Sequence, residues 1–466
     1  MLKIFNSFTG KKEYFKPIVA NKISMYVCGA TVYDFCHIGH GRTFIIFDVI
    51  ARYLRYCGYQ LKYIRNITDI DDKIINACYK KNESIYLFTN RMIDYMNQDF
   101  KLLNILPPDI EPKVTEYITV IIDMITELLE LNHAYISQDG DVVFSINSDK
   151  NYGMLSKQFL NFLKYSHRMK NSNIVKKNKL DFVLWKISKY NEPHWNSPWG
   201  PGRPGWHIEC SAISRATLGS TFDIHGGGSD LLFPHHENER SQSMCVNKTT
   251  YANYWMHSGM VILKNQKMSK SLGNVCILKD ILNNYDSEIV RYYLLSSHYR
   301  HPLYYSEEHL KISSLALIRL YRALHNTNFR DKMINNSSFE VEFKKAMDDD
   351  FNTPVVFSIF LKLANQINFF KKQKDTIKVN QLASILKFLG KKLGLLLHDP
   401  AVFLKNISRY TDQQVNEIET LLEIRNTARK LKYWNKADNI RRYLLNLGIV
   451  IEDDKHKTFW YSVKKL

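Results

Sequence analysis

No stretch of this sequence approaches the ~18 consecutive apolar residues that a membrane-spanning helix needs. The first residues, MLKIFNSFTGKK, become polar within a few positions, so they lack the apolar segment of a secretory signal. The first absence excludes a transmembrane protein, and the second argues against a secreted one. We therefore expect a cytoplasmic protein without a membrane partner.

Cysteine is scarce as well. The seven cysteines among 466 residues stand at positions 28, 36, 57, 78, 210, 245 and 276. Their number is odd, and they are too sparse for a disulfide framework in a chain of this size. We expect reduced thiols, some of which are available to bind a metal ion. Internal repeats and low-complexity tracts are also missing from the chain.

Acidic residues are outnumbered by basic ones. The chain has 64 Lys and Arg against 46 Asp and Glu, a formal charge of +18. An excess of this size favours a polyanionic partner, for which RNA or DNA is the natural candidate. A general preference for lysine, seen together with many asparagines and isoleucines, explains the charge equally well. Charge alone therefore leaves the partner open.

The length and composition indicate a globular protein with several domains. A single core stops growing near ~250–300 residues, so a chain of 466 residues is expected to form about two to four domains. Hydrophobic residues make up 45% and charged residues 24%, as in ordinary soluble proteins.

A strand–helix–strand pattern opens the first domain. The sequence predicts a strand over 24–28, a glycine-bearing turn, an amphipathic helix over about 42–56 and a strand over 60–65. That order is a βαβ unit. Three prolines in the following segment NILPPDIEP then mark a boundary.

The rest of the chain changes character twice. A helix over 114–132, followed by strands and lysine-rich loops up to about 190, indicates an insertion between two halves of a larger sheet. Residues from about 305 to 397 are predicted to be almost wholly helical. The final helices are followed by GIVIEDD and TFWYSV, which predict a β-hairpin.

Two short motifs suggest phosphate chemistry. HIGH, His37 to His40, stands between the first strand and the first helix, where a helix N-terminus attracts phosphate and Gly39 permits close approach. KMSKS, Lys267 to Ser271, offers lysines that can close over a polyphosphate. Each motif alone is more often a solvated surface segment. Their occurrence together and in this order is much more specific.

Four further residues form a candidate metal set. His235 and Glu239 are four residues apart, so a helix entered at Pro234 would point both to one side. Cys28 ends the first predicted strand and Cys210 stands in WHIEC. Zinc accepts thiolate, imidazole and carboxylate ligands together. Each residue also has an ordinary explanation as a buried thiol or a helix pair, and spacing does not show that the four converge.

Both signature motifs resemble those of the class I aminoacyl-tRNA synthetases. The resemblance extends to the cysteinyl-tRNA synthetase family, whose blocks are similar, in order, to YVCGATVYDFCHIGH, RNITDIDDKI, DFVLWK, GWHIECSAIS, HGGGSDLLFPHHENE, KMSKSLGN and DDDFNTP. It runs from about Tyr26 to Trp460, nearly the whole chain.

The resemblance implies an α/β fold with a split Rossmann-like parallel sheet as catalytic core, an inserted connective domain, a helical bundle and a small C-terminal α+β domain. The expected boundaries are 1–112 and 199–262 for the two halves of the core, 113–198 for the insertion, 263–307 for the KMSKS loop and stem-contact fold, 308–400 for the bundle, and 401–466 for an anticodon-binding domain.

The implied activity is that of a cysteine–tRNA ligase. Such an enzyme activates L-cysteine with ATP and transfers it from cysteinyl adenylate to the 3′-terminal adenosine of tRNA(Cys). The resemblance implies one Zn²⁺ per chain, held by Cys28, Cys210, His235 and Glu239, and Mg²⁺ bound with the ATP. A zinc–thiolate bond separates cysteine from serine, which an apolar pocket discriminates by only ~1–3 kcal/mol. We expect the protein to act as a monomer.

The resemblance also assigns roles to individual residues. The expected catalytic residues are His37, His40 and Lys270, and the expected ATP-binding residues are these three with Gly39 and Lys267. The cysteine pocket is expected to include Thr68, Trp206 and His225. The anticodon is expected to contact Arg429, Trp434, Asp438 and Asp453.

Two alternatives remain open from the sequence. A related ligase that joins cysteine to an amino-sugar acceptor shares the activation core, although the roughly 150 residues after Tyr305 and the charge of +18 argue against it. A non-catalytic zinc-bearing RNA-binding protein is the other, and the intact HIGH and KMSKS motifs argue against that one.

Overall fold

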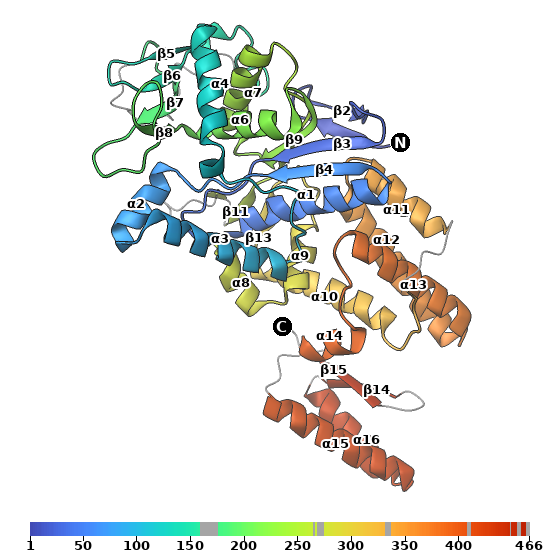
Figure 1. Ribbon diagram of the computed structural model, residues 1–466. Helices are drawn as coiled ribbons and strands as arrows, with labels where there is room; N and C mark the ends of the chain where they lie inside the picture. The colour runs from blue at the N-terminus through green and yellow to red at the C-terminus, as the bar shows by residue number, and fades with distance from the viewer. Residues whose placement is uncertain are drawn as a thin grey trace. The chain divides into compact units, whose positions relative to one another are not determined.

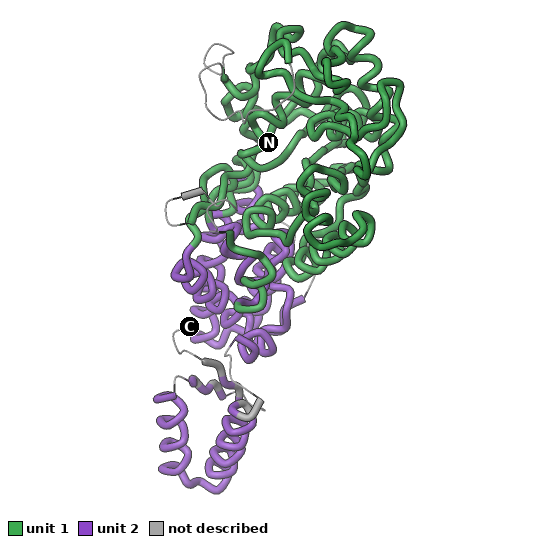
Figure 2. The backbone as a smooth tube through the Cα atoms, turned by 90° about the vertical axis from the view of Figure 1, so that its left-hand side faces the viewer, with its two compact units in different colours: residues 1–284, 297–305, 346–353 green, residues 285–296, 306–345, 354–466 purple. Residues whose placement is uncertain are grey.

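The computed structural model describes residues 1–158, 176–263, 266–267, 275–330, 337–407, 412–447, 449–453 and 458–462. The chain divides into two compact units, coloured separately in Figure 2. Unit 1 comprises residues 1–284, 297–305 and 346–353, and unit 2 comprises residues 285–296, 306–345 and 354–466.

A four-stranded parallel sheet forms the centre of unit 1. Its strands follow the order β10-β9-β3-β4, with β3 at Lys22–Val27, β4 at Gln60–Arg65, β9 at Phe222–Gly228 and β10 at Ala252–Ser258. In register, Met25 of β3 stands opposite Tyr63 of β4 and Ile224 of β9. The predicted βαβ unit and split parallel sheet are thereby confirmed.

Helices cover both faces of this sheet. Figure 1 shows α1 (Ile38–Tyr56) on one side and α6 (Trp206–Leu218) with α7 (Glu237–Asn247) on the other. The chain passes from β3 to β4 through α1 and from β9 to β10 through α7. From the adjacent strands β3 and β9, the chain thus continues toward opposite edges of the sheet. In α/β sheets, ligands bind in the crevice at the carboxyl ends of two such strands.

The insertion carries its own sheet. Strands β5 (Ala134–Ile136), β6 (Val142–Phe144), β7 (Phe182–Ile187) and β8 (Gly202–Pro204) pair antiparallel in chain order. The helix predicted over 114–132 begins as a 3₁₀ turn, Val114–Glu116, and continues as α4, Ile118–Glu130. Much of the lysine-rich loop, residues 159–175, lies outside the described residues.

Smaller elements complete unit 1. They are the hairpin β1 (Lys3–Asn6) and β2 (Lys11–Tyr14), helices α2 (Asp72–Lys81), α3 (Ile85–Leu102) and α8 (Leu278–Asn284), the 3₁₀ turn Ile146–Ser148, and a sheet of β11 (Val261–Leu263), β12 (Gln266–Lys267) and β13 (Leu303–Tyr305).

The described residues of unit 2 are helical apart from one hairpin. Its helices are α9 (Ser287–Leu294), α10 (Glu307–Leu324), α11 (Ser338–Asp348, whose last turn belongs to unit 1), α12 (Thr353–Lys372), α13 (Thr376–Lys392), α14 (Pro400–Asn406), α15 (Asp412–Lys430) and α16 (Trp434–Asn446). The predicted hairpin is β14 (Ile449–Asp453) with β15 (Thr458–Ser462), in which Ile451 pairs with Trp460. Both residues join a small core with Leu444 and Leu422.

None of the described helices combines the length and apolar character that crossing a membrane requires.

Candidate metal centre and active site

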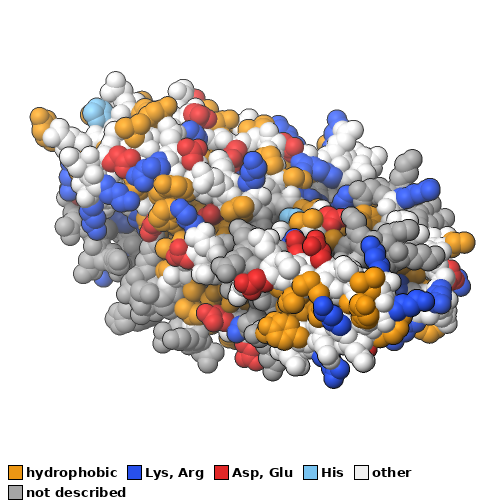
Figure 3. Space-filling model, turned by 90° about the horizontal axis from the view of Figure 1, so that it is seen from below, with side chains coloured by type: hydrophobic (Ala, Val, Ile, Leu, Met, Phe, Trp, Pro, Cys, Tyr) orange, Lys and Arg blue, Asp and Glu red, His pale blue; other side chains and the backbone are white. Residues whose placement is uncertain are grey.

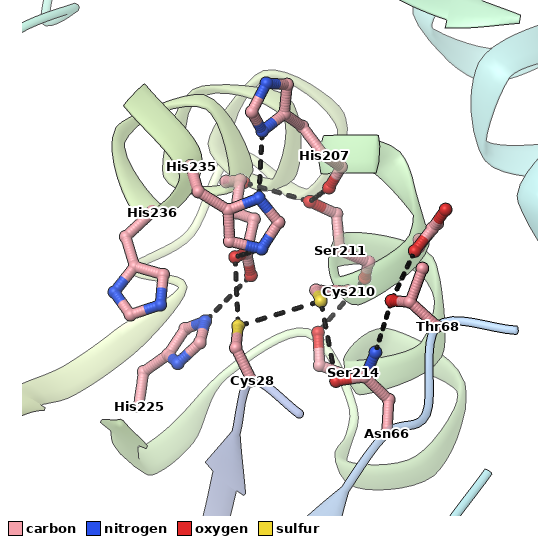
Figure 4. A network of polar contacts seen from close by, with 12 residues as sticks. Cys28, Asn66, Thr68, His207, Cys210, Ser211, Ser214, His225, His235 and His236 are labelled. Carbon is pink, nitrogen blue, oxygen red and sulfur yellow. Dashed lines mark hydrogen bonds and ion pairs between the residues drawn. The ribbon is translucent and has the colours of Figure 1, made fainter. Parts of the chain in front are cut away.

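Cys28 stands directly after β3, at the carboxyl edge of the central sheet (Figure 4). The next residue, Gly29, donates its N–H to the side-chain oxygen of Asn66 over 2.9 Å. A Cβ on Gly29 would come within 1.5 Å of the Asn66 carbonyl oxygen, so only glycine permits this approach. The chain after β3 is therefore held against the chain after β4.

Cys210 reaches the same point from α6. Its sulfur lies 3.6 Å from the sulfur of Cys28, although the two residues are 182 positions apart. Both thiols are buried within the main hydrophobic core cluster. Two thiolates bound to one tetrahedral zinc ion at ~2.3 Å would lie about 3.8 Å apart, close to this separation.

His235 and Glu239 supply the nitrogen and oxygen donors. Nε2 of His235 lies 2.9 Å from Oε1 of Glu239, and the Cys28 sulfur lies 3.2 Å from the same oxygen. The contact of His235 with Glu239 agrees with the prediction that a helix entered at Pro234 points both residues to one side. The backbone is non-helical at Phe233, directly before Pro234, the segment Leu232–His236 includes a π-helical turn, and the helix continues as α7 from Glu237.

These four residues meet the requirements of a metal site. Their donor atoms all lie within 4.8 Å of one another, and all four side chains are buried. Two thiols, an imidazole and a carboxylate form a donor set that zinc accepts. Buried polar groups of this kind need a bound ion or one another as partners. The residues present therefore fit a zinc ion.

A second donor set overlaps the first. It shares Cys28 and Glu239 but takes its nitrogens from His225 and His236. Nε2 of His225 lies 2.8 Å from Oε2 of Glu239, the oxygen that faces away from His235. His236 is fully buried, and its ring lies 4.5 Å from that of His225.

The protein environment shifts the pKa values of these groups apart. Burial raises the pKa of Glu239, but the charges of His235 and His225 outweigh it and hold that pKa well below 4.5. Burial lowers the pKa of His235, yet Glu239 raises it to about 10. Burial raises the pKa of the Cys28 thiol. Burial also opposes ionisation of Cys210, but its hydrogen bond with Cys28 brings its pKa to about 6. Glu239 and Cys210 are thus favoured as buried anions, which suits a cation site.

Two aromatic neighbours hold His235. Nδ1 of His207 lies 2.9 Å from Nδ1 of His235, so one ring donates to the other. Trp206 stacks on His235 with ring centroids 4.2 Å apart, and 38% of its surface is exposed. The predicted pocket residue Trp206 therefore lies beside the donor cluster. The sequence analysis missed His207, for which adjacency to Trp206 was the only signal.

Thr68 lies at the other side of Cys210. Its hydroxyl donates to Oε2 of Glu209 over 3.0 Å, and Asn66 lies 3.4 Å from that hydroxyl. The Cys210 sulfur lies 3.7 Å from the side-chain oxygen of Asn66. Burial raises the pKa of Glu209 well above 4.5. Asn66 and Glu209 were also missed, because neither residue type is rare enough to stand out in the sequence.

The HIGH motif begins α1. His37 is the N-cap, and its Nδ1 accepts from the backbone N–H groups of Gly39 (3.1 Å) and His40 (3.3 Å). Nδ1 of His40 accepts in return from the backbone N–H of His37, and the two rings stack at 3.8 Å. A helix N-terminus normally offers its first backbone N–H groups to a phosphate. Here two of these N–H groups, of Gly39 and His40, already donate to the His37 side chain.

The segment after KMSKS runs beside the HIGH turn. The N–H of Ile38 donates to the carbonyl of Cys276 over 3.0 Å, and the N–H of Leu278 donates to the carbonyl of Cys36 over 2.8 Å. The HIGH turn is thereby joined, through an antiparallel bridge between His37 and Ile277, to the segment that begins four residues after KMSKS. Lys267 lies in β12, while Lys270 and Ser271 fall outside the described residues.

The predicted anticodon residues separate into two pairs. Arg429 and Asp453 bind one another at 2.7 Å, and Asp453 also receives two hydrogen bonds from the buried Arg425. Trp434 and Asp438 are exposed, one turn apart on α16, with Trp434 58% exposed. Asp453 is therefore a partner of neighbouring arginines, whereas Trp434 offers an open aromatic surface.

The basic residues do not gather into one patch on the face that Figure 3 shows. Lys and Arg side chains there are interspersed with acidic and apolar ones. Net charge alone therefore does not locate an RNA-binding surface on this face.

Three family models match the chain. Residues 14–314 match the class I tRNA synthetase (C) catalytic domain, residues 342–398 match the DALR domain, and residues 413–460 match the cysteinyl-tRNA ligase anticodon binding domain. The first model alone covers more than half of the 466 residues.

Curated relatives match over the full length. The chain is 56% identical to the cysteine–tRNA ligase of Buchnera aphidicola subsp. Acyrthosiphon pisum (strain Tuc7), over 100% of both chains. It is 54% identical to the cysteine–tRNA ligase of Erwinia tasmaniensis, over 99% of both chains.

Solved structures share the fold at low identity. A methionyl-tRNA synthetase of Mycobacterium tuberculosis in complex with methionyl-adenylate aligns with a TM-score of 0.56 and 14% identity, over 83% of this chain and 91% of that one. A leucyl enzyme, the Agrobacterium radiobacter K84 agnB2 LeuRS in a ternary complex with tRNA and LeuAMS, aligns with a TM-score of 0.57 and 11% identity, over 81% and 84%. These likenesses bear on the fold alone.

Proposed function

This chain belongs to the cysteine–tRNA ligase family of class I aminoacyl-tRNA synthetases, and we propose that it activates L-cysteine with ATP and esterifies tRNA(Cys) at its 3′-terminal adenosine. The observation that carries the proposal is the convergence of Cys28, Cys210, His235 and Glu239, whose donor atoms lie within 4.8 Å of one another beside the HIGH crevice. We further propose that the protein acts in the cytoplasm as a monomer.

In this proposal the cluster selects the amino acid. Cys28, Cys210, His235 and Glu239 would hold a zinc ion, which would supply a borderline-soft Lewis acid with affinity for a thiolate sulfur. A hydroxyl is a much weaker ligand, so serine is rejected without a separate editing domain. Trp206 and Thr68, which flank the cluster, line the amino-acid pocket, with His225 supporting Glu239 from behind.

The residues of the HIGH and KMSKS motifs orient the ATP and stabilise the charge on its phosphates. His37 and His40 offer imidazoles at the positive end of α1, and Gly39 allows the nucleotide to approach the backbone. Because the amides of Gly39 and His40 already donate to His37, the imidazoles rather than these amides meet the phosphates. Lys267 and Lys270 add positive charge where the pyrophosphate leaves. Mg²⁺ accompanies the ATP as part of the substrate.

The chemistry needs no general base from the protein. The carboxylate of cysteine attacks the α-phosphate of ATP in line, which yields cysteinyl adenylate and pyrophosphate. A ribose hydroxyl of the RNA then displaces AMP from the adenylate. Positioning and electrostatic stabilisation supply most of the acceleration.

RNA rather than an amino-sugar alcohol is the acceptor in this proposal. The match of residues 413–460 to an anticodon binding domain supports it. So does the exposed Trp434, because aromatic faces stack on unpaired bases.

One experiment tests the proposal as a whole. Metal content of the purified chain is measured together with ATP–pyrophosphate exchange in the presence of each of the twenty amino acids, and then with charging of a tRNA(Cys) transcript. We expect about one zinc per chain, exchange with cysteine alone, and charging of the transcript. Exchange with serine at a comparable rate would overturn zinc-based selection, and cysteine-dependent exchange without transcript charging would favour the amino-sugar acceptor.

A further inference from the structure

A cavity of about 330 Å³ opens at the junction of α2 and α3, outside the crevice of the proposed active site. Three of its lining residues are apolar and are here called its apolar floor: Ile75, Cys78 and Ile85. The others are Tyr79, Asn82, Glu83, Ser84, Asn191 and Pro193. The volume falls at the lower end of the ~300–1,000 Å³ usual for small-ligand pockets, so one planar ring system fits better than an extended ligand.

Two asparagines line the cavity. Asn82 ends α2 in the left-handed conformation (φ 50°), and Asn191 is also left-handed (φ 65°). The hydroxyl of Tyr79 donates to the backbone carbonyl of Asn191 over 3.0 Å, which ties the loop after β7 to α2. A carboxamide offers two donors and one acceptor oxygen, a combination suited to the polar edge of a nucleobase.

The segments that line the cavity carry exposed tyrosines. Tyr79 is 58% exposed, Tyr86 is 74% exposed and Tyr190 is 93% exposed. Tyr79 lines the cavity itself, and the other two are adjacent in sequence to the lining residues Ile85 and Asn191. Exposed tyrosines beside a pocket are the usual platform on which unpaired bases stack.

Lysines flank the lining residues in the sequence. Glu83, which lines the cavity, pairs with Arg91, and Glu192, which follows Asn191, pairs with Arg203. Lys80 and Lys189 are exposed and belong to none of these pairs. Two lysines beside neutralised carboxylates favour a ligand that carries phosphate.

The cavity is also within reach of the proposed active site. Helix α2 begins at Asp72, which binds Arg203 three positions before Trp206. The cavity is lined along the same helix, from Ile75, three residues after Asp72, to Asn82 at its C-cap.

We propose that the α2–α3 cavity binds one unpaired nucleotide of the RNA substrate, with the base on the apolar floor between Asn82 and Asn191 and the phosphates at Lys80 and Lys189. This inference rests on the proposed function and deepens it, since it identifies where unit 1 binds the single-stranded end of the tRNA substrate.

The test separates RNA contact from amino-acid activation. One variant combines Lys80→Gln and Lys189→Gln, and a second combines Asn82→Gly and Asn191→Gly, which keeps both left-handed backbones and removes only the amides. Lys101→Gln, an equally exposed lysine in the last turn of α3, is the matched control. The full chain is used throughout, with a tRNA(Cys) transcript for charging and binding and RNA-free ATP–pyrophosphate exchange as the measure of an intact active site.

We expect the KM for the transcript to rise about tenfold in each double variant, with exchange unchanged and no effect of Lys101→Gln. The slope of log affinity against log salt should fall in magnitude by about 1.4 in the lysine variant, since two single-strand phosphate contacts are lost. An unchanged KM for the transcript overturns the inference. So does a raised KM for ATP in exchange, because the cavity would then bind free nucleotide.

Failure of the proposed function is recognisable separately. In that case the unaltered chain shows no cysteine-dependent exchange, while the dissociation constant of the transcript, measured by fluorescence anisotropy, still decides the cavity. A weaker transcript affinity in both double variants supports RNA binding there, and an unaltered affinity refutes it.

Discussion

The donor cluster of unit 1 and the helix–hairpin module of unit 2, which comprises α15, α16, β14 and β15, were predicted from the same resemblance. They differ in how far their predicted site residues are exposed to solvent. Cys28, Cys210, His235 and Glu239 are each at most 4% exposed and come from separate segments. Trp434 and Asp438 lie on one exposed helix face. A buried polar group needs a partner, so burial itself is evidence for a ligand at the cluster. An exposed residue has water as a partner, and its exposure shows only that contact with RNA is open to it.

Asp453 illustrates the same contrast within the module. Its two oxygens accept from Arg425, which is 3% exposed, and Arg429 lies 2.7 Å from one of them. The carboxylate therefore stabilises the junction of α15 with β14. A residue matched to an anticodon position can thus owe its identity to the folding of the module rather than to RNA.

The largest expected effect is that of Cys210→Ser. Removing one soft donor should release the zinc and lower kcat/KM for cysteine in exchange by about 10³-fold or more, since the selective contact is lost. Circular dichroism and bound-metal analysis establish that the fold remains while the ion is gone. Cys245→Ser changes a cysteine of similar burial outside both donor sets and should retain activity. A zinc-free Cys210→Ser chain that still binds cysteine tightly would contradict the role of the cluster.

A smaller effect is expected of His225→Leu. Nε2 of His225 meets Oε2 of Glu239 at 2.8 Å, so its loss should leave Glu239 less well oriented and weaken zinc binding about 10–100-fold. Competition with a chelator measures this affinity. His225→Gln keeps a donor and should recover part of it. If zinc affinity is unaltered in both variants while the KM for cysteine rises, His225 contacts the amino acid rather than supporting Glu239.

A substitution in the helix–hairpin module is expected to weaken RNA binding without affecting amino-acid activation. Trp434→Ala should raise the KM for the tRNA transcript about tenfold through the loss of one stacked base, without altering RNA-free exchange. Tyr443→Ala removes another exposed ring, 54% exposed, from the same helix and serves as the control. If both substitutions raise the KM for the transcript equally, exposed aromatic rings on α16 contribute without distinction, and Trp434 does not bind a particular base.

The smallest expected effect is a pH dependence of that module. The hydrogen bond from Arg425 brings the pKa of Asp453 from 3.8 to about 2. Because the folded pKa is depressed, the stabilisation is complete above about pH 4 and is lost as pH falls towards 2. With the carboxylate partly exposed, about 1 kcal/mol is expected.

Hydrogen exchange of peptides from β14 and β15 checks this dependence. Protection should fall between pH 4 and 2 in the unaltered chain and should already be low at pH 5 in Asp453→Asn. The exchange reaction in unit 1 should be unaffected by the substitution. Identical protection in both chains at pH 5 would show that the arginine pairs add nothing to the stability of the module.

Regular elements could be predicted from the sequence where hydrophobic periodicity is local. The strand predicted over 60–65 has the observed bounds Gln60–Arg65, and the C-terminal hairpin forms as expected. The contact between His235 and Glu239 could also be predicted, because a spacing of four residues on the helix after Pro234 is a local property. The kink at Phe233 and the π-helical turn could not, since no periodic pattern indicates them.

The sequence by itself determined the order of the strands and helices, the two signature motifs and the kinds of donor available, because each of these is a property of neighbouring residues. Only the tertiary structure decided that Cys28 meets Cys210 from 182 positions away and Glu239 from 211 positions away. It alone decided that His225 takes the second oxygen of Glu239, and that Asp453 binds arginines. Convergence of this kind depends on how the helices pack onto the sheet, and no local pattern records it.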